Sequence, residues 1–108
     1  MTKLECSVWN NGGTGWGLKV LGGLEVRRTH FDRAQSPILV ELDGTPFSFN
    51  IGKKSFWTQG CGEIISAPLR AWIMKQGLTS GDRVLLEVLK PYQTFKAMPH
   101  KIRSTKEN

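Results

Sequence analysis

The segment from Ser66 to Leu89, SAPLRAWIMKQGLTSGDRVLLEVL, constrains the fold more than any other part of the chain. Its first half places three large apolar side chains at helical spacing on one face: Leu69, Trp72 and Ile73. Gly77 is the left-handed stop expected after such a helix. The segment therefore predicts a short helix around residues 67–76, which must be stabilised by packing against the rest of the chain.

The second half of this segment predicts a strand at the centre of a sheet. Ser80-Gly81-Asp82 forms a turn signal, and five of the six residues from Val84 to Leu89 are apolar. A nearly continuous apolar run is typical of a strand that is covered on both faces. Pro91 ends this strand.

Alternating apolar residues predict hairpins elsewhere in the chain. Residues 38–51 form the clearest one, because Asp43-Gly44 is a strong two-residue turn signal. Residues 4–9 and 16–20 predict a second hairpin, joined by a glycine-rich loop. The remaining segments are assigned as a short strand at 24–28, either a helical turn capped by Thr29 or a loop at 29–36, a loop at 52–62 and a last strand within 92–98.

Hairpins with one helix inserted among them predict an α+β, mainly β fold. The arrangement that best satisfies the pattern is a small, partly open barrel, or pseudobarrel, of antiparallel hairpins with one short helix around residues 67–76. With 108 residues in total, the chain is expected to form a single domain at 1–98, followed by a basic, flexible tail at 99–108.

The charge of the chain favours an anionic partner. The formal net charge is +6 and the isoelectric point is about 9.7, which suits nucleic acid, although many small basic proteins carry such a charge for solubility alone. The N-terminal residues have no signal-peptide core, and no apolar run is long enough to cross a membrane. We therefore expect a soluble cytoplasmic protein with no membrane partner.

Basic and aromatic residues gather in three stretches that could contact nucleic acid. Arg27, Arg28 and Arg33 carry guanidinium groups suited to phosphate or guanine, but could instead form a solvated edge with Arg33–Asp32 or Arg28–Glu25 pairs. Lys53 and Lys54 precede Trp57, and suit a phosphate backbone with a base nearby; alternatively the lysines are surface residues and the aromatics face the core. Trp16 ends the glycine-rich loop and could stack on a ligand.

No catalytic, metal or cofactor motif is present in the sequence. The glycine-rich loop is followed by a strand and lacks a Lys-Ser or Lys-Thr pair, so it is neither a P-loop nor a dinucleotide fingerprint. His30 has no nucleophile paired with it, and the spacing of Cys6, His30, Cys61 and His100 matches no metal site. We expect both cysteines to be reduced; the alternative is a single disulfide between them. We predict no cofactor and no metal; enzymatic activity is left open, and a non-enzymatic role is favoured.

The residues from Ile38 to Phe95 resemble the plant B-three DNA-binding domain and related DNA-binding pseudobarrels of some bacterial restriction enzymes. The matching features are the Asp-Gly hairpin, a helix with a central Trp and a Gly-Asp turn that opens an apolar strand: Trp72, Gly77, Leu78, Gly81 and Asp82. The resemblance implies DNA binding, with the loop that holds Lys53 and Lys54 as one contacting arm. The N-terminal half departs from the family, since a glycine-rich hairpin stands where its first strand and helix are expected. The chain also resembles small bacterial mobile gene-cassette proteins, which implies no activity.

Two functions follow as hypotheses. The first is a nucleic-acid-binding module, with duplex DNA as the expected partner. The alternative is a module that binds a small ligand, a protein partner or a second copy of itself through an aromatic-lined barrel mouth. A contiguous basic face would favour the first, and an aromatic pocket with scattered cations would favour the second.

Overall fold

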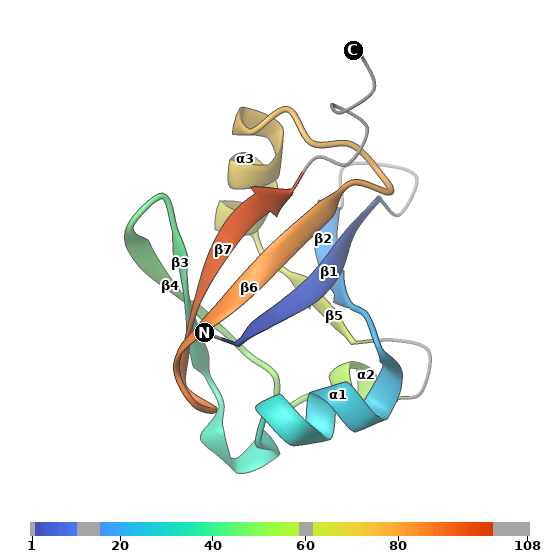
Figure 1. The fold of residues 1–108 in the computed structure, drawn as a ribbon, viewed down its shortest axis with the longest axis vertical. Helices are drawn as coiled ribbons and strands as arrows, with labels where there is room; N and C mark the ends of the chain where they lie inside the picture. Colours follow the sequence, from blue (N-terminus) through green and yellow to red (C-terminus); the bar gives the residue numbers. More distant parts are fainter. Residues whose placement is uncertain (1, 11–15, 59–61, 101–108) are drawn as a thin grey trace.

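A single sheet of seven strands forms the body of the protein (Figure 1). The computed structural model describes residues 2–10, 16–58 and 62–100. The strand order is β4-β3-β7-β6-β1-β2-β5, and the sheet curls into a nearly closed barrel, which confirms the expected mainly β pseudobarrel. The strands are β1 Lys3–Asn10, β2 Trp16–Val20, β3 Ile38–Leu42, β4 Thr45–Phe49, β5 Glu63–Ile65, β6 Arg83–Lys90 and β7 Thr94–His100.

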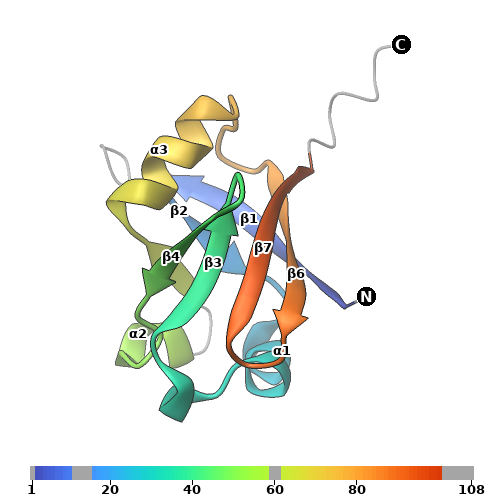
Figure 2. The ribbon, with the colours of Figure 1, turned by 90° about the vertical axis from the view of Figure 1, so that its left-hand side faces the viewer.

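Helices lie at the two ends of this barrel. The α3 helix, Ala67–Lys75, covers one end, while α1, Gly23–His30, and α2, Lys54–Trp57, lie at the other end (Figures 1 and 2). A single 3-10 turn, η1, Arg33–Gln35, follows α1 at the same end. None of the helices in the described part of the chain combines the length and the apolar character needed to cross a membrane.

The α3 helix confirms the sequence prediction for residues 67–76. The Ser66 hydroxyl accepts a hydrogen bond from the Leu69 amide at 3.2 Å and so caps the N-terminus. Leu69, Trp72 and Ile73 are all buried. Gly77 has a φ of 68°, and the Leu78 amide returns to the Ile73 carbonyl at 3.1 Å, which completes the expected C-terminal stop.

The β3–β4 hairpin is joined to α3 through its turn. Asp43 and Gly44 both have positive φ values, 53° and 84°, as a two-residue hairpin turn of this kind requires. The Asp43 carboxylate accepts hydrogen bonds from Lys75 Nζ at 2.9 Å and from Trp72 Nε1 at 3.2 Å. The hydrogen bond from Lys75, followed by that from Trp72, lowers the pKa of the Asp43 carboxyl.

The segment 24–28 is helical, so its assignment as a strand is wrong. Arg27 and Phe31, four positions apart, are both buried, and Val26 packs against the core. The sequence hides this pattern because one of the two buried residues is an arginine. The 3-10 turn that follows is capped by Asp32, not by Thr29, which lies inside α1.

Four further expectations are corrected. Four residues of the loop assigned to 52–62 form α2. The barrel is not purely antiparallel, because β3 pairs with β7 in parallel. The β6 strand is central but is fully buried on one face only, since Leu89 is 41% exposed. Pro99 and His100, which we assigned to the tail, pair with β6 as part of β7, and residues 101–108 lie outside the described part of the chain.

Candidate nucleic-acid interface

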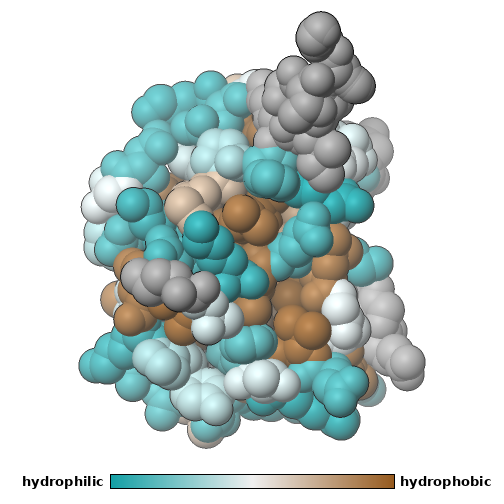
Figure 3. Space-filling model, viewed as in Figure 1, coloured by the Kyte–Doolittle hydropathy of each residue, from teal (hydrophilic) through white to brown (hydrophobic). Residues whose placement is uncertain are grey.

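Four of the predicted basic contact residues meet at the α1–α2 end of the barrel. Arg28 comes from α1, Arg33 from η1, and Lys53 and Lys54 from the start of α2; all four are exposed. Arg33 Nε donates a hydrogen bond to the Gly52 carbonyl at 3.0 Å, which fixes η1 beside the chain that leads into α2. Residues 25 positions apart in the sequence are thereby brought to one surface, which we call the basic end. In the space-filling view the rim over α1 is hydrophilic, whereas apolar side chains show among polar ones over the strands (Figure 3).

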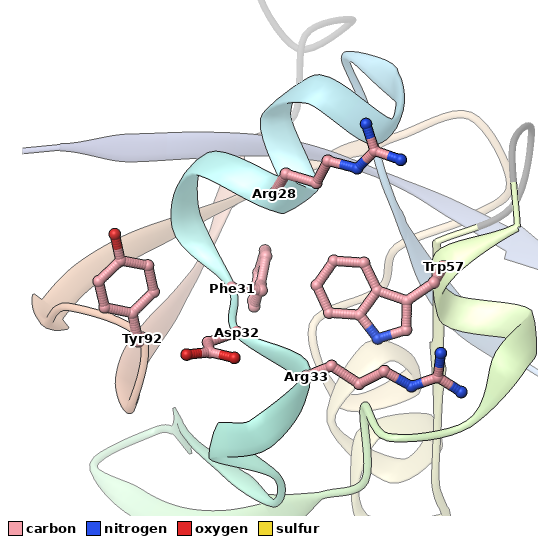
Figure 4. Close-up of a pocket in the computed structure, with 6 residues that line it drawn as sticks. All are labelled: Arg28, Phe31, Asp32, Arg33, Trp57 and Tyr92. Atoms are coloured by element: carbon pink, nitrogen blue, oxygen red, sulfur yellow. The ribbon is translucent and has the colours of Figure 1, made fainter.

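A hollow of about 450 Å³ opens at the basic end (Figure 4). Six residues from α1, η1, α2 and the β6–β7 turn line it: Arg28, Phe31, Asp32, Arg33, Trp57 and Tyr92. The side chains of Arg28 and Arg33 lie on either side of the Trp57 indole, and Tyr92 stands across the hollow from it (Figure 4). The hollow thus combines two cations, one carboxylate and three aromatic rings.

The aromatic part of this hollow is held firmly by the core. The Phe31 ring stacks on Phe95 with centroids 4.9 Å apart, and meets the Phe56 ring edge-on at 5.2 Å. Phe56 packs edge-on against Trp57 at 5.1 Å. Trp57 is half-buried, and its Nε1 donates to the Ile51 carbonyl at 2.7 Å. One edge of the indole is therefore fixed by the protein while the rest faces the hollow.

Arg27, one of the predicted contact residues, is buried instead. Its side chain is 1% exposed, and its Nη1 donates hydrogen bonds to the carbonyls of Phe56 and Thr58, the latter at 3.0 Å. A Cβ at Gly62 would lie 3.0 Å from the arginine side chain, so glycine is needed there for close approach. The prediction that Arg27 contacts a ligand is therefore wrong. Arg27 instead positions α2 against α1.

Trp16 does not lie at the basic end. It starts β2, which runs from the α3 end of the barrel toward α1, and it pairs with Asn10 of β1 (Figure 1). Its ring is half-buried and packs against the core. The glycine-rich loop before it, residues 11–15, lies outside the described residues, so its predicted role as a ligand-binding loop stays a prediction.

The exposed cations of the basic end are available to a ligand. Arg28, Arg33, Lys53 and Lys54 form no ion pair with any residue that the structure describes. The alternative pairing of Arg28 with Glu25 and of Arg33 with Asp32 is therefore not realised. The position of Arg28 also has a structural reason. It lies in the last turn of α1, where a cation stabilises the negative end of the helix dipole.

His30 and Cys6, the other candidates from the sequence that the structure describes, do not line this hollow. His30 lines a separate hollow of about 120 Å³ that contains no carboxylate or thiol. Cys6 is a free, buried thiol, as expected, and burial, followed by the charge of Glu5, raises its pKa to about 12. Cys61 lies outside the described part of the chain, and no group of three or more potential metal ligands occurs in the rest.

Sequence reasoning missed three residues that line the hollow: Phe31, Asp32 and Tyr92. Phe31 and Asp32 lie between two predicted contact residues, Arg28 and Arg33, so the stretch from 27 to 33 signalled them indirectly. Tyr92 could not be found in this way, because only the closure of the barrel brings the β6–β7 turn beside η1 and α2.

Comparison with known proteins adds no assignment to this site. No protein-family model, no curated protein and no solved structure matches the chain. The resemblance of residues 38–95 to B-three domains thus remains a hypothesis, and the geometry of the basic end carries the functional argument.

Proposed function

We propose that the protein binds nucleic acid through the basic end of its barrel. The observation that carries this proposal is a hollow in which Arg28 and Arg33 flank the half-buried Trp57, with Lys53 and Lys54 exposed at the start of the helix that holds this tryptophan. Phosphate contacts from Lys and Arg supply most of the affinity of such modules, and aromatic rings add stacking on bases.

The alternative hypothesis, a small-ligand or protein-binding module, has weaker support. It requires an aromatic pocket with the cations scattered elsewhere. An aromatic hollow is present, but its own walls include Arg28 and Arg33, and the two lysines lie on the adjoining helix. The resemblance to DNA-binding pseudobarrels also favours nucleic acid.

Salt-dependent binding tests the proposal directly. A fluorescent DNA duplex of roughly 10 base pairs, one helical turn, is titrated with the protein between roughly 50 and 200 mM salt. We expect binding that weakens steeply as salt rises. The double variant Lys53→Gln/Lys54→Gln should bind more weakly, with a log–log salt slope shallower by about 1.8, since each lost phosphate contact removes about 0.9.

The matched control removes two cations from the opposite end of the molecule. Arg70→Gln/Lys75→Gln changes the net charge equally, and both residues lie exposed on α3. It should retain the wild-type slope. Equal losses in both double variants would mean that net charge alone drives binding, and no binding by the folded protein at low salt would refute the proposed function.

A further inference from the structure

We infer that the hollow at the basic end receives a single unpaired nucleobase, with guanine as the preferred base. This inference rests on the proposed function and specifies its ligand. A volume of about 450 Å³ lies within the range of roughly 300–1,000 Å³ that small-molecule sites occupy. A base within a duplex is stacked and paired, so only a single strand, a bulge or an end can present one to a hollow of this kind.

Tyr92 supplies the first independent observation. Its φ of 67° lies in the left-handed region, where a bulky side chain is an outlier and glycine or asparagine is normal. Its ring nevertheless remains 43% exposed at the edge of the hollow and is not part of the core. Backbone strain that supports no packing is a mark of functional positions. The exposed ring opposite Trp57 offers a second stacking surface for a base.

Asp32 supplies the second observation, because it argues against a site for phosphate alone. A carboxylate that lines the same hollow as two arginines would repel a bare phosphate, but it can accept hydrogen bonds from the donors of a base. Its Oδ1 accepts the Ala34 amide at 2.9 Å, which fixes the side chain, and Oδ2 has no hydrogen bond among the described residues. A carboxylate oxygen that is held in place and still free to accept selects ligands with exposed N–H groups.

Guanine matches these groups better than the other bases. Its Watson–Crick edge carries two adjacent donors, the N1 and N2 hydrogens, which face the two oxygens of a carboxylate. Thymine and uracil offer one donor flanked by two carbonyl oxygens that the carboxylate repels. Arg28 and Arg33, on either side of Trp57, are then placed to bind the phosphates that flank the stacked base (Figure 4).

The test compares probes that differ only in the presence of an unpaired base. Fluorescence anisotropy at low salt measures the affinity for a blunt duplex, the same duplex with one bulged guanine, and the same duplex with one bulged thymine. We expect the bulged guanine to bind about tenfold tighter than the blunt duplex, because stacking of one base on an aromatic ring supports a gain of roughly this size. The bulged thymine should gain little.

Two variants isolate the hollow without disturbing the fold. Tyr92→Gly relieves the strained backbone, and should remove the advantage of the bulged guanine while leaving the affinity for the blunt duplex unchanged. Asp32→Asn keeps an acceptor for the Ala34 amide, and should reduce the preference for guanine over thymine. Met74→Ala, an exposed apolar position on α3, serves as the control and should behave as the wild type.

The outcomes separate this inference from the proposed function. If all three probes bind equally and the lysine variants still flatten the salt slope, the hollow takes no base and the proposed function stands. If guanosine monophosphate binds but no oligonucleotide does, the hollow is a mononucleotide site, and both the inference and the proposed function are wrong. If a bulged guanine is preferred and Tyr92→Gly preserves that preference, the base is bound elsewhere and the inference is overturned.

Discussion

Arg27 and Arg28 are neighbouring arginines of α1, but Arg27 is buried and Arg28 is exposed. The direction in which α1 faces sets this difference. The sequence offers both as contact residues, and only the direction in which α1 faces decides that Arg27 is buried with Phe31 while Arg28 is exposed. A buried arginine is rare unless its donors are used, and this one donates to carbonyls of α2. Single-residue roles of this kind are not predictable from composition or charge, because they depend on which way a short helix faces.

Replacing Arg27 by methionine should therefore destabilise the protein and disturb the site at once. Arg27→Met keeps a long side chain but leaves the Phe56 and Thr58 carbonyls without this donor, which costs about 1–3 kcal/mol. Urea denaturation measures the loss. Arg28 is the next residue in the chain and is exposed. Arg28→Met should therefore change the free energy of unfolding by less than about 0.5 kcal/mol. Equal effects of the two substitutions would contradict the positioning role of Arg27.

At the scale of elements, the chain is predictable where a local pattern is long enough to fix a period. The α3 helix and the β3–β4 hairpin were predicted because each carries both a periodic apolar face and its own turn residue. The α1 helix was not, because its buried residue is an arginine and its N-cap, Gly22, has no capping side chain. The α2 helix was not, because four residues form little more than one turn. The side chains of the basic end come mostly from these two helices, so the candidate site was less predictable than the barrel that supports it.

The contact between the hairpin and α3 predicts a pH dependence. The pKa of Asp43 is lowered in the folded protein by the hydrogen bonds from Lys75 and Trp72, so the folded state binds its proton less readily than the unfolded chain does. The stabilisation is therefore fully present above the unfolded pKa of about 3.9, and is lost as the pH falls through the lower folded pKa. Asp43→Asn retains a residue that tolerates positive φ but removes the charge.

We expect Asp43→Asn to be less stable than the wild type at neutral pH, with the difference disappearing in acid. Urea midpoints of the two proteins, measured from neutral pH down through the pKa of a carboxyl group, provide the comparison. Glu41→Gln, on the neighbouring strand, controls for the general loss of a negative charge. A gap between wild type and Asp43→Asn that stays constant across the whole pH range would show that the charge of Asp43 is not what joins the hairpin to α3.

For the whole molecule, the barrel explains how distant residues make one surface. Hairpins and a central strand are visible in the sequence, but the strand order is not, and neither is the parallel pairing of β3 with β7. That order closes the sheet and sets Tyr92, from the β6–β7 turn, across the hollow from Trp57 of α2 (Figure 4). A net charge of +6 states only that anions are attracted. The fold places four of the exposed cations, Arg28, Arg33, Lys53 and Lys54, at one end of the barrel.

Because a ligand of the native basic end stabilises the entire cooperative unit, DNA should raise the melting temperature. A ligand that binds only the folded state at about ten times its Kd contributes about 1.4 kcal/mol, which corresponds to a shift of about 5–10 °C for a domain of this size. Differential scanning fluorimetry with the blunt duplex measures it.

The shift should follow the charges of the basic end. It should shrink in Lys53→Gln/Lys54→Gln at the same DNA concentration and persist in Arg70→Gln/Lys75→Gln, because only the first pair lies on the proposed contact surface. High salt should abolish it in all three proteins by removing the counterion-release term. A shift that is independent of salt, or that both double variants lose equally, would mean that DNA does not bind the folded protein through α2 and its surroundings.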